Sequence, residues 1–209
     1  PSIGRDHMSY LGNTLSEIAL EKAAIIHGRG SVILGPLSPG VRKAIFSAYP
    51  EAFYYRVGKD FETKRMQGSE KLIYLSREGE MKGLSYELSL SGLFQHLNSS
   101  LVLKTLECMK KDGFLISGEK VIRALQKVYW PGRFELIQKK PPLLLDVAHN
   151  VPALKMLLSS MAEEFPGEKF NCICGFCRDK EYLFMLTLLS RVCRSITLIP
   201  FASERNISP

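Results

Sequence analysis

The feature that most constrains the fold is an alternation of short apolar strands with helices in the last third of the chain. Strands are expected at FELI (134–137), LLLDV (143–147), KFNCICG (169–175) and SITLIP (195–200), and helices at 152–165 and 179–193. Short strands that are apolar throughout are typical of a parallel sheet with helices on both faces. The sequence therefore predicts an α/β fold for this part.

The earlier part of the chain carries signals for helices and for a hairpin. Thr14 and Glu17 form a capping-box pattern that predicts a helix ending near Gly28. Ser38-Pro39 predicts the start of another helix, with Val41, Ala44, Ile45 and Ala48 facing inward. Strands are expected at 31–35, 53–57, 71–76 and 84–90, the last two as a hairpin, and helices at 93–111 and 118–129.

Trp130-Pro131-Gly132-Arg133 marks the best candidate for a domain boundary. A helix stop, a proline and a glycine precede a new strand there. A chain of 209 residues is long enough for two modest domains, and we expect them at 1–130 and 131–209.

The net charge of +7 and the pI near 9.2 allow either a nucleic-acid partner or a polyanionic small substrate. The lysine pairs at 110–111 and 139–140 have no interleaved aromatic residues, so we expect no nucleic-acid partner. No apolar run approaches the roughly 20 residues of a membrane span, and no signal segment opens the sequence. A cytoplasmic protein without a membrane partner is expected.

Cys172, Cys174 and Cys177 form a cluster among five cysteines. A metal site usually adds a second C-x-x-C unit or histidines, and neither accompanies this cluster. The spacing of Cys172 and Cys174 instead favours two thiols on one buried face of a strand. The odd number of cysteines argues against a secreted disulfide framework.

Lys22 lies four residues from both Ile18 and Ile26, so helical periodicity places it on the apolar side of its helix. A lysine removed from water favours the neutral amine. The structural alternative is a lysine whose stem reaches the edge of that side and keeps its charge in water.

His7 follows Asp6 in a segment that reads as the loop after a strand, where open α/β sheets bind ligands. A neutral imidazole beside a carboxylate can ligate a cation or relay a proton, and the alternative is a structural loop histidine.

Asp146 ends the LLL strand, and the next helix directs its N-terminus to the same place. A carboxylate there can accept a ribose hydroxyl while the helix N–H groups hold an anion. The alternative is simple helix capping by Asp146 or Asn150. The sequence holds no G-x-S-x-G signature and no complete G-x-x-x-x-G-K-[ST] phosphate loop.

Four segments share motifs with one family, in the same order. Residues 2–25 are similar to the motifs SIG-x-DH, LG-x-T and IA-x-EKAGI, and GLFQHLN (92–98) is similar to G-x-x-Q-x-x-N. WPGRFE (130–135) matches a linker motif, and LLLDVAHN (143–150) matches a DGAHN signature. The chain thereby resembles folylpolyglutamate synthase/dihydrofolate synthase, of the Mur ligase superfamily.

The resemblance implies the rear of a P-loop-type central ATPase domain at 1–130, followed by an incomplete Rossmann-like C-terminal domain at 131–209. It implies a ligase that phosphorylates a carboxylate of dihydropteroate or a folate with ATP and joins it to L-glutamate. Mg²⁺ is implied as well, because phosphoryl transfer concentrates negative charge. A monomer acting on these small molecules is expected.

The resemblance also implies roles for particular residues. His7 matches a magnesium ligand, and Lys22 matches a lysine that is N-carboxylated in many members. Asn98, which falls on the apolar stripe of its helix beside Leu97 and Leu101, matches a residue that contacts the nucleotide. Arg133 matches the linker arginine that reaches the ATP phosphates. Asp146 matches an ATP-contacting aspartate, and His149 is its neighbour in the same motif.

The sequence departs from the family pattern in several places. The phosphate loop, the serine and glutamate that share the magnesium, and the last part of the C-terminal domain are not in it, so we expect residues 1–209 alone to be inactive. Val147, Ala24 and Ser99 replace a glycine, a glycine and an alanine. Three alternatives stay open: a peptidoglycan-precursor ligase, a non-catalytic nucleotide-binding module and a basic nucleic-acid-binding protein.

Overall fold

The computed structural model describes residue 3 and residues 11–203, which form two compact units. The first unit holds residues up to Leu90 together with Gln95–Tyr129. The second holds Ser91–Phe94 and the chain from Trp130 onward. Assignment of the two units to particular ligase domains stays a prediction.

The first unit opens with α2 (Leu15–Ala23), whose start is the capping box predicted from sequence. The Thr14 hydroxyl accepts from the Glu17 N–H at 3.2 Å, and the Glu17 carboxylate accepts from the Thr14 N–H at 3.0 Å. The expected end near Gly28 is wrong. The helix ends at Ala23 because the N–H groups of Ala24 and Ile26 bond only three residues back, in tighter turns.

Two parallel strands, β1 (Ser31–Leu34) and β2 (Phe53–Arg56), flank the helix α3 (Pro39–Ala48). Ser38 caps α3 as predicted, accepting from the Val41 N–H at 3.5 Å. Val41 and Ile45 are buried in a cluster with Ala19 and Ala23 of α2, whereas Ala48, at the last turn, is exposed and not inward.

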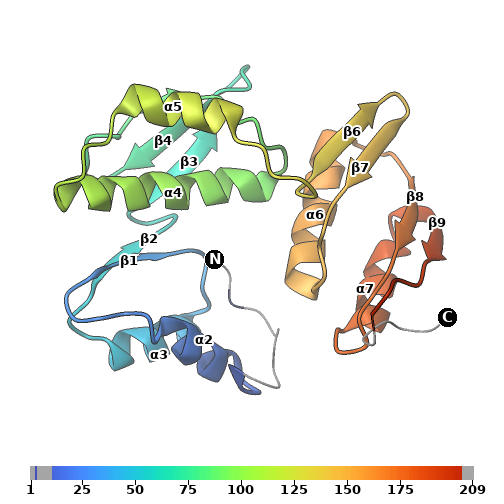
Figure 1. Cartoon of the computed structure of the whole chain (residues 1–209), viewed down its shortest axis with the longest axis horizontal. Coiled ribbons are helices and arrows are strands. Elements are labelled where there is room, and N and C mark those ends of the chain that lie inside the picture. The colour runs from blue at the N-terminus through green and yellow to red at the C-terminus, as the bar shows by residue number, and fades with distance from the viewer. Residues whose placement is uncertain (1–2, 4–10, 204–209) are drawn as a thin grey trace. The chain divides into compact units, whose positions relative to one another are not determined.

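A three-stranded antiparallel sheet follows, with the order β3 (Phe61–Arg65), β4 (Leu72–Ser76) and β5 (Ser85–Tyr86). The predicted hairpin is present as β4 and β5. Strand β3 was not predicted, because FETKR contains a single apolar residue. Helices α4 (Leu93–Lys111) and α5 (Gly118–Lys127) lie side by side over this sheet (Figure 1). The shared core contains Phe61, Leu72, Tyr74, Tyr86, Leu103, Val121 and Leu125.

The buried side of α4 is unusually polar. The expected stripe is partly wrong: Cys108 is buried, Leu97 and Leu101 are half-buried, and Thr105 is exposed. The positions that are buried instead are Gln95, Ser99, Ser100, Leu103, Lys104 and Glu107. Hydrogen bonds allow this, because a buried polar group is tolerated when it is paired. The side chain of Ser99, for example, lies 2.7 Å from the Tyr86 hydroxyl.

The second unit contains a hairpin and a separate pair of parallel strands. Strands β6 (Glu135–Lys139) and β7 (Pro142–Leu145) are antiparallel, with Glu135 opposite Leu145. The prediction that these two segments belong to a parallel sheet is therefore wrong. Only two residues separate them, and a parallel pair needs a crossover of a dozen or more.

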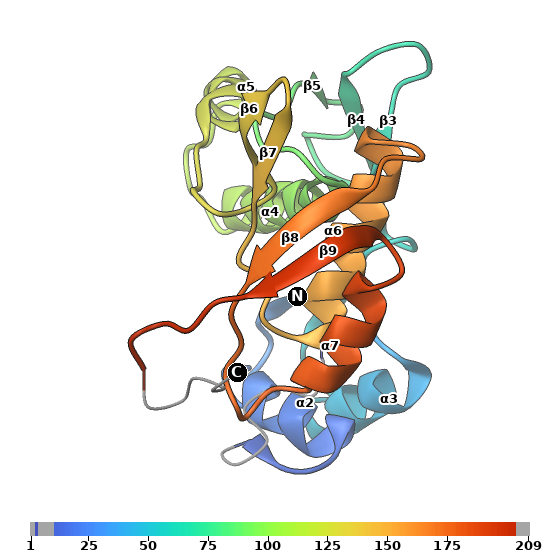
Figure 2. The same ribbon diagram turned by 90° about the vertical axis from the view of Figure 1, so that its right-hand side faces the viewer.

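Strands β8 (Phe170–Cys174) and β9 (Cys193–Leu198) form the parallel pair. Helices α6 (Val151–Glu164) and α7 (Tyr182–Leu189) lie on one side of it (Figure 2). Leu154, Met185 and Leu189 pack there with inward residues of both strands. Among the described residues only this face is covered, since Ile173 on the other face is 70% exposed. The α/β class is confirmed, but the two-sided sheet is not.

Cys172 and Cys174 share the half-buried face of β8, as the spacing predicts, and pack with Cys193 of β9. All three are free thiols. Burial raises the pKa of Cys172 and of Cys193 to about 11. Within residues 3 and 11–203, no group of three His, Cys, Asp or Glu side chains can hold a metal ion. No helix in the same residues is both long and apolar enough to cross a membrane.

Candidate functional site

The linker motif folds into a tight turn at the entrance of the second unit. Gly132 has φ +69° and Phe134 has φ +49°, a value that is rare for a residue other than glycine. The Gly132 N–H donates to the Glu135 carboxylate at 2.7 Å. The Phe134 ring is 3% exposed, so it anchors the turn in the interior of the unit.

The loop after β7 holds this turn from the other side. The Asp146 carboxylate accepts from the Phe134 N–H and from the Ala148 N–H, each at 2.8 Å. The Val147 N–H donates to the Gly132 carbonyl at 2.9 Å. Two motifs separated in sequence, WPGRFE and LLLDVAHN, are therefore fastened to each other by backbone and carboxylate hydrogen bonds.

Helix α6 begins directly after this loop. Asn150 caps it by accepting from the Ala153 N–H at 2.9 Å, which confirms one of the two capping residues considered. Asp146 is not the helix cap, because its oxygens accept from Phe134 and Ala148. His149 is exposed, and its Nδ1–H donates to the Val147 carbonyl at 3.0 Å.

Arg133 lies between the two anchored residues of the turn and is exposed. Among the described residues its guanidinium has no hydrogen-bond or ion-pair partner, so its planar set of donors is available to an anion. Arg133, Asp146 and His149 thus belong to one unit and come from adjoining segments of it.

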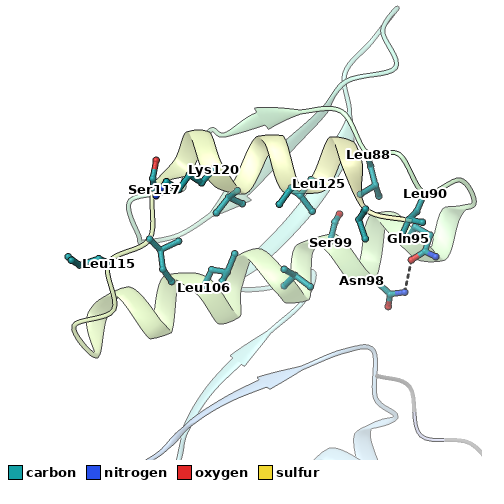
Figure 3. A pocket seen from close by; sticks show the side chains of 15 residues that line it. Leu88, Leu90, Gln95, Asn98, Ser99, Leu106, Leu115, Ser117, Lys120 and Leu125 are labelled. Atoms are coloured by element: carbon teal, nitrogen blue, oxygen red, sulfur yellow. Dashed lines mark hydrogen bonds between the residues drawn. The ribbon is translucent and has the colours of Figure 1, made fainter. Parts of the chain in front are cut away.

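Asn98 lies in the first unit and is exposed, so the expectation that it is buried on the apolar side of α4 is wrong. It points away from the helix, and its Nδ2 donates to the side-chain Oε1 of the buried Gln95 at 3.0 Å (Figure 3). In the described part of the chain, the Asn98 carbonyl has no protein donor, so it can accept from a ligand.

A cavity of about 480 Å³ lies beside this amide pair, between α4 and α5 (Figure 3). Its walls are mostly aliphatic, with Gln95, Asn98 and Ser99 at one end and Ser117 and Lys120 at the other. A largely apolar cavity with a few polar groups is typical of a small-molecule site.

Lys22 lies on α2 and is exposed, so the expectation that its amine is removed from water is wrong for this structure. The short helix explains this: α2 buries Ile18, Ala19 and Ala23, and it ends before Ile26 can extend an apolar side past Lys22. His7 lies outside the described residues.

The roles of two residues of the turn were not predicted from the sequence. The only indication in the sequence of the hydrogen bond from Gly132 to Glu135 is that Glu135 is the last residue of the linker motif. The positive φ of Phe134 had no signal at all, since a bulky aromatic residue does not favour that conformation.

No protein-family model matches the chain. Individual relatives do match. The chain is 31% identical to the dihydrofolate synthase/folylpolyglutamate synthase of Bacillus subtilis, over 98% of this chain and 48% of that protein. It is 25% identical to the folylpolyglutamate synthase of Lacticaseibacillus casei, over 95% of this chain and 47% of that protein.

The solved structures agree with the sequence matches. The folylpolyglutamate synthase of Mycobacterium tuberculosis, complexed with ADP and AMPPCP, superimposes with a TM-score of 0.82 at 27% identity. That match covers 99% of this chain and 48% of that one.

The chain thus shares a mixed α/β fold with these synthases. Over nearly its whole length it resembles the folylpolyglutamate synthase/dihydrofolate synthase family. It spans about half the length of the curated relatives it matches.

Proposed function

We propose that the protein containing this chain is an ATP-dependent ligase that adds L-glutamate to dihydropteroate, to folates, or to both. The match to the Bacillus subtilis enzyme over 98% of the chain carries the proposal, and the motif residues Arg133, Asp146 and His149 lie in adjoining segments of this chain. The ADP and AMPPCP in the Mycobacterium tuberculosis structure support a nucleotide as one substrate.

The proposed reaction has two steps. A carboxylate oxygen of the pteroate or folate attacks the γ-phosphorus of ATP, giving an acyl phosphate and ADP. The amine of L-glutamate then attacks the acyl carbon, phosphate leaves, and an amide forms with loss of a proton from the nitrogen. Arg133 would bind the phosphates, where a planar cationic donor stabilises the charge of the transferring group.

Asp146 and Asn98 would bind the rest of the nucleotide. Each Asp146 oxygen accepts one backbone hydrogen bond and keeps a lone pair that a ribose hydroxyl can use. The exposed Asn98 carbonyl beside the apolar cavity suits a nucleobase edge. His149, exposed at the start of α6, is the candidate for a group that contacts the reacting phosphates.

Mg²⁺ is part of the proposal through the family, but the described residues do not supply its site. No group of three potential ligands occurs among them, and His7 lies outside them.

Carboxylation of Lys22 also stays a proposal. Its amine is exposed, so burial does not favour the neutral form that adds CO2. An intact-mass increase of one CO2 that acid removes would support carboxylation, and an unmodified mass in bicarbonate buffer would exclude it.

The proposal is tested on the intact protein with ATP, L-glutamate and either dihydropteroate or a reduced folate. A product heavier by one glutamyl residue is expected with at least one acceptor. A product formed only from muramyl substrates would show a peptidoglycan-precursor ligase. Nucleotide binding that Asp146→Ala weakens, with hydrolysis indifferent to every amino acid, would show a non-catalytic nucleotide module.

A further inference from the structure

We propose that Glu135 is a positioning residue for Arg133. Its carboxylate holds the turn from which the arginine reaches the nucleotide phosphates, and this inference rests on the proposed function. Glu135 is half-buried, and its carboxylate accepts a hydrogen bond at 2.7 Å from the N–H of Gly132, the residue immediately before Arg133. A hydrogen bond to an ionised acceptor is stronger than one between neutral groups.

The backbone on both sides of Arg133 is fixed by carboxylates. Glu135 binds the N–H of Gly132, and Asp146 binds the N–H of Phe134. The Gly132 carbonyl is held as well, by the Val147 N–H. The residue in the middle therefore has a defined backbone, while its side chain is exposed.

The turn would not keep this shape unaided. Phe134 has a positive φ, a strained conformation for a residue other than glycine that persists only where the surroundings enforce it. Gly92 leaves room for the Phe134 ring, since a Cβ at Gly92 would lie 3.2 Å from the Phe134 Cγ. The ring and the Asp146 carboxylate fix the Phe134 end of the strained turn, and the Glu135 carboxylate holds the Gly132 end.

Because of its position, Glu135 can hold the Arg133 turn through its side chain independently of the strand pairing of its backbone. Glu135 is the first residue of β6, opposite Leu145, so its backbone belongs to the hairpin while its side chain turns back to Gly132. Replacing the side chain leaves the backbone pairing available. Loss of the carboxylate should therefore loosen the Arg133 turn more than the hairpin.

The test is a double-mutant cycle in the intact protein, with the dissociation constants of ADP and AMPPCP as the readout. Glu135→Ala should weaken AMPPCP binding about tenfold in the presence of Arg133 and less than about twofold in the Arg133→Ala background. Glu135→Gln keeps an acceptor for Gly132 and should recover most of the loss. Lys139→Ala, an exposed change on the same strand, should leave both constants unchanged.

Equal effects of Glu135→Ala with and without Arg133, or no effect in either background, would overturn the positioning role. If the wild-type protein bound no nucleotide, the proposed function would fail separately. Hydrogen exchange at the Gly132 amide would then decide: faster exchange in Glu135→Ala than in Lys139→Ala supports the hold on the turn, and equal exchange overturns it.

Discussion

The Asp146 carboxylate accepts a hydrogen bond from the Phe134 N–H at 2.8 Å, across twelve residues of sequence and the whole β6–β7 hairpin. The bond closes the base of that hairpin and joins the linker motif to the loop before α6. Asp146 is thus a structural residue of the second unit as well as a proposed nucleotide contact. Its two roles predict two separable effects.

Asp146→Ala should lower the free energy of unfolding by about 1–3 kcal/mol, because two buried or half-buried N–H groups lose their acceptor. Asp146→Asn keeps one carbonyl oxygen and should lose less. Denaturant unfolding of both variants measures this, with exposed Glu168→Ala as the control. An Asp146→Ala variant as stable as the control would show that the bonds contribute nothing.

Gly132 and Val147 fit each other closely. A Cβ at Gly132 would lie 2.8 Å from the Val147 Cγ1, and Gly132 has φ +69°. Gly132→Ala should therefore destabilise the fold by about 1–3 kcal/mol, through backbone strain and the clash together.

Val147→Ala in the same chain removes the clash but not the strain, so the double variant should recover only part of the loss. Thermal unfolding of the four proteins in the cycle separates the two contributions. Simple additivity of the two substitutions would contradict the close contact between Gly132 and Val147.

The helix N-caps were the structural features best predicted from the sequence. Thr14, Ser38 and Asn150 cap α2, α3 and α6 because a cap needs only a side chain and the next turn of helix. The pairing of β6 with β7 was mispredicted, because an apolar pattern identifies a strand but not the strand with which it pairs.

Features that depend on tertiary contacts were missed as well. Lys22 was expected inside because periodicity was extended beyond the real end of α2. The positive φ of Phe134 arises only once Asp146 and Gly92 surround it. The motif residues Arg133 and Asp146 could be chosen from sequence, but the hydrogen bonds by which Glu135 and Asp146 hold the turn could not.

Lys104 and Glu107 form an ion pair that no sequence pattern indicated. Their side chains are each 1% exposed and lie 3.1 Å apart. The Glu107 carboxylate also accepts from the Tyr74 hydroxyl at 3.0 Å, and the Lys104 ammonium lies 4.3 Å from the centre of the Tyr55 ring. Lys104→Met would leave a buried carboxylate without its cation, which typically costs about 3–5 kcal/mol.

Lys120→Met, at an exposed position of α5, should change stability by less than about 0.5 kcal/mol. Urea unfolding of both variants makes the comparison. If Lys104→Met were no more destabilising than Lys120→Met, the Lys104–Glu107 pair would not stabilise the first unit.

The thiols of Cys172 and Cys193 should react slowly with alkylating agents in the folded protein. Burial, with a smaller effect from the neighbouring thiol, raises the pKa of each to about 11. At pH 8 only about one molecule in a thousand then carries the thiolate, which is the reactive form. Labelling by iodoacetamide should rise with pH toward that value and become fast on unfolding in urea, as peptide mass analysis can follow.

Rapid labelling of Cys172 and Cys193 at pH 8 without urea would contradict their placement between β8, β9 and the helices. Protection that required added zinc would instead show a metal site, which the spacing of the cysteines does not favour.

The proposed activity is that of a ligase that consumes ATP to join glutamate to a pteroate or folate. The most direct measurement is the ratio of ADP released to amide formed by the intact protein, with glutamate or the folate acceptor omitted in turn. We expect one ADP per amide bond and a large loss of both when either substrate is missing or Arg133 is replaced by alanine. ADP release that is unchanged when glutamate or the acceptor is omitted would contradict this activity.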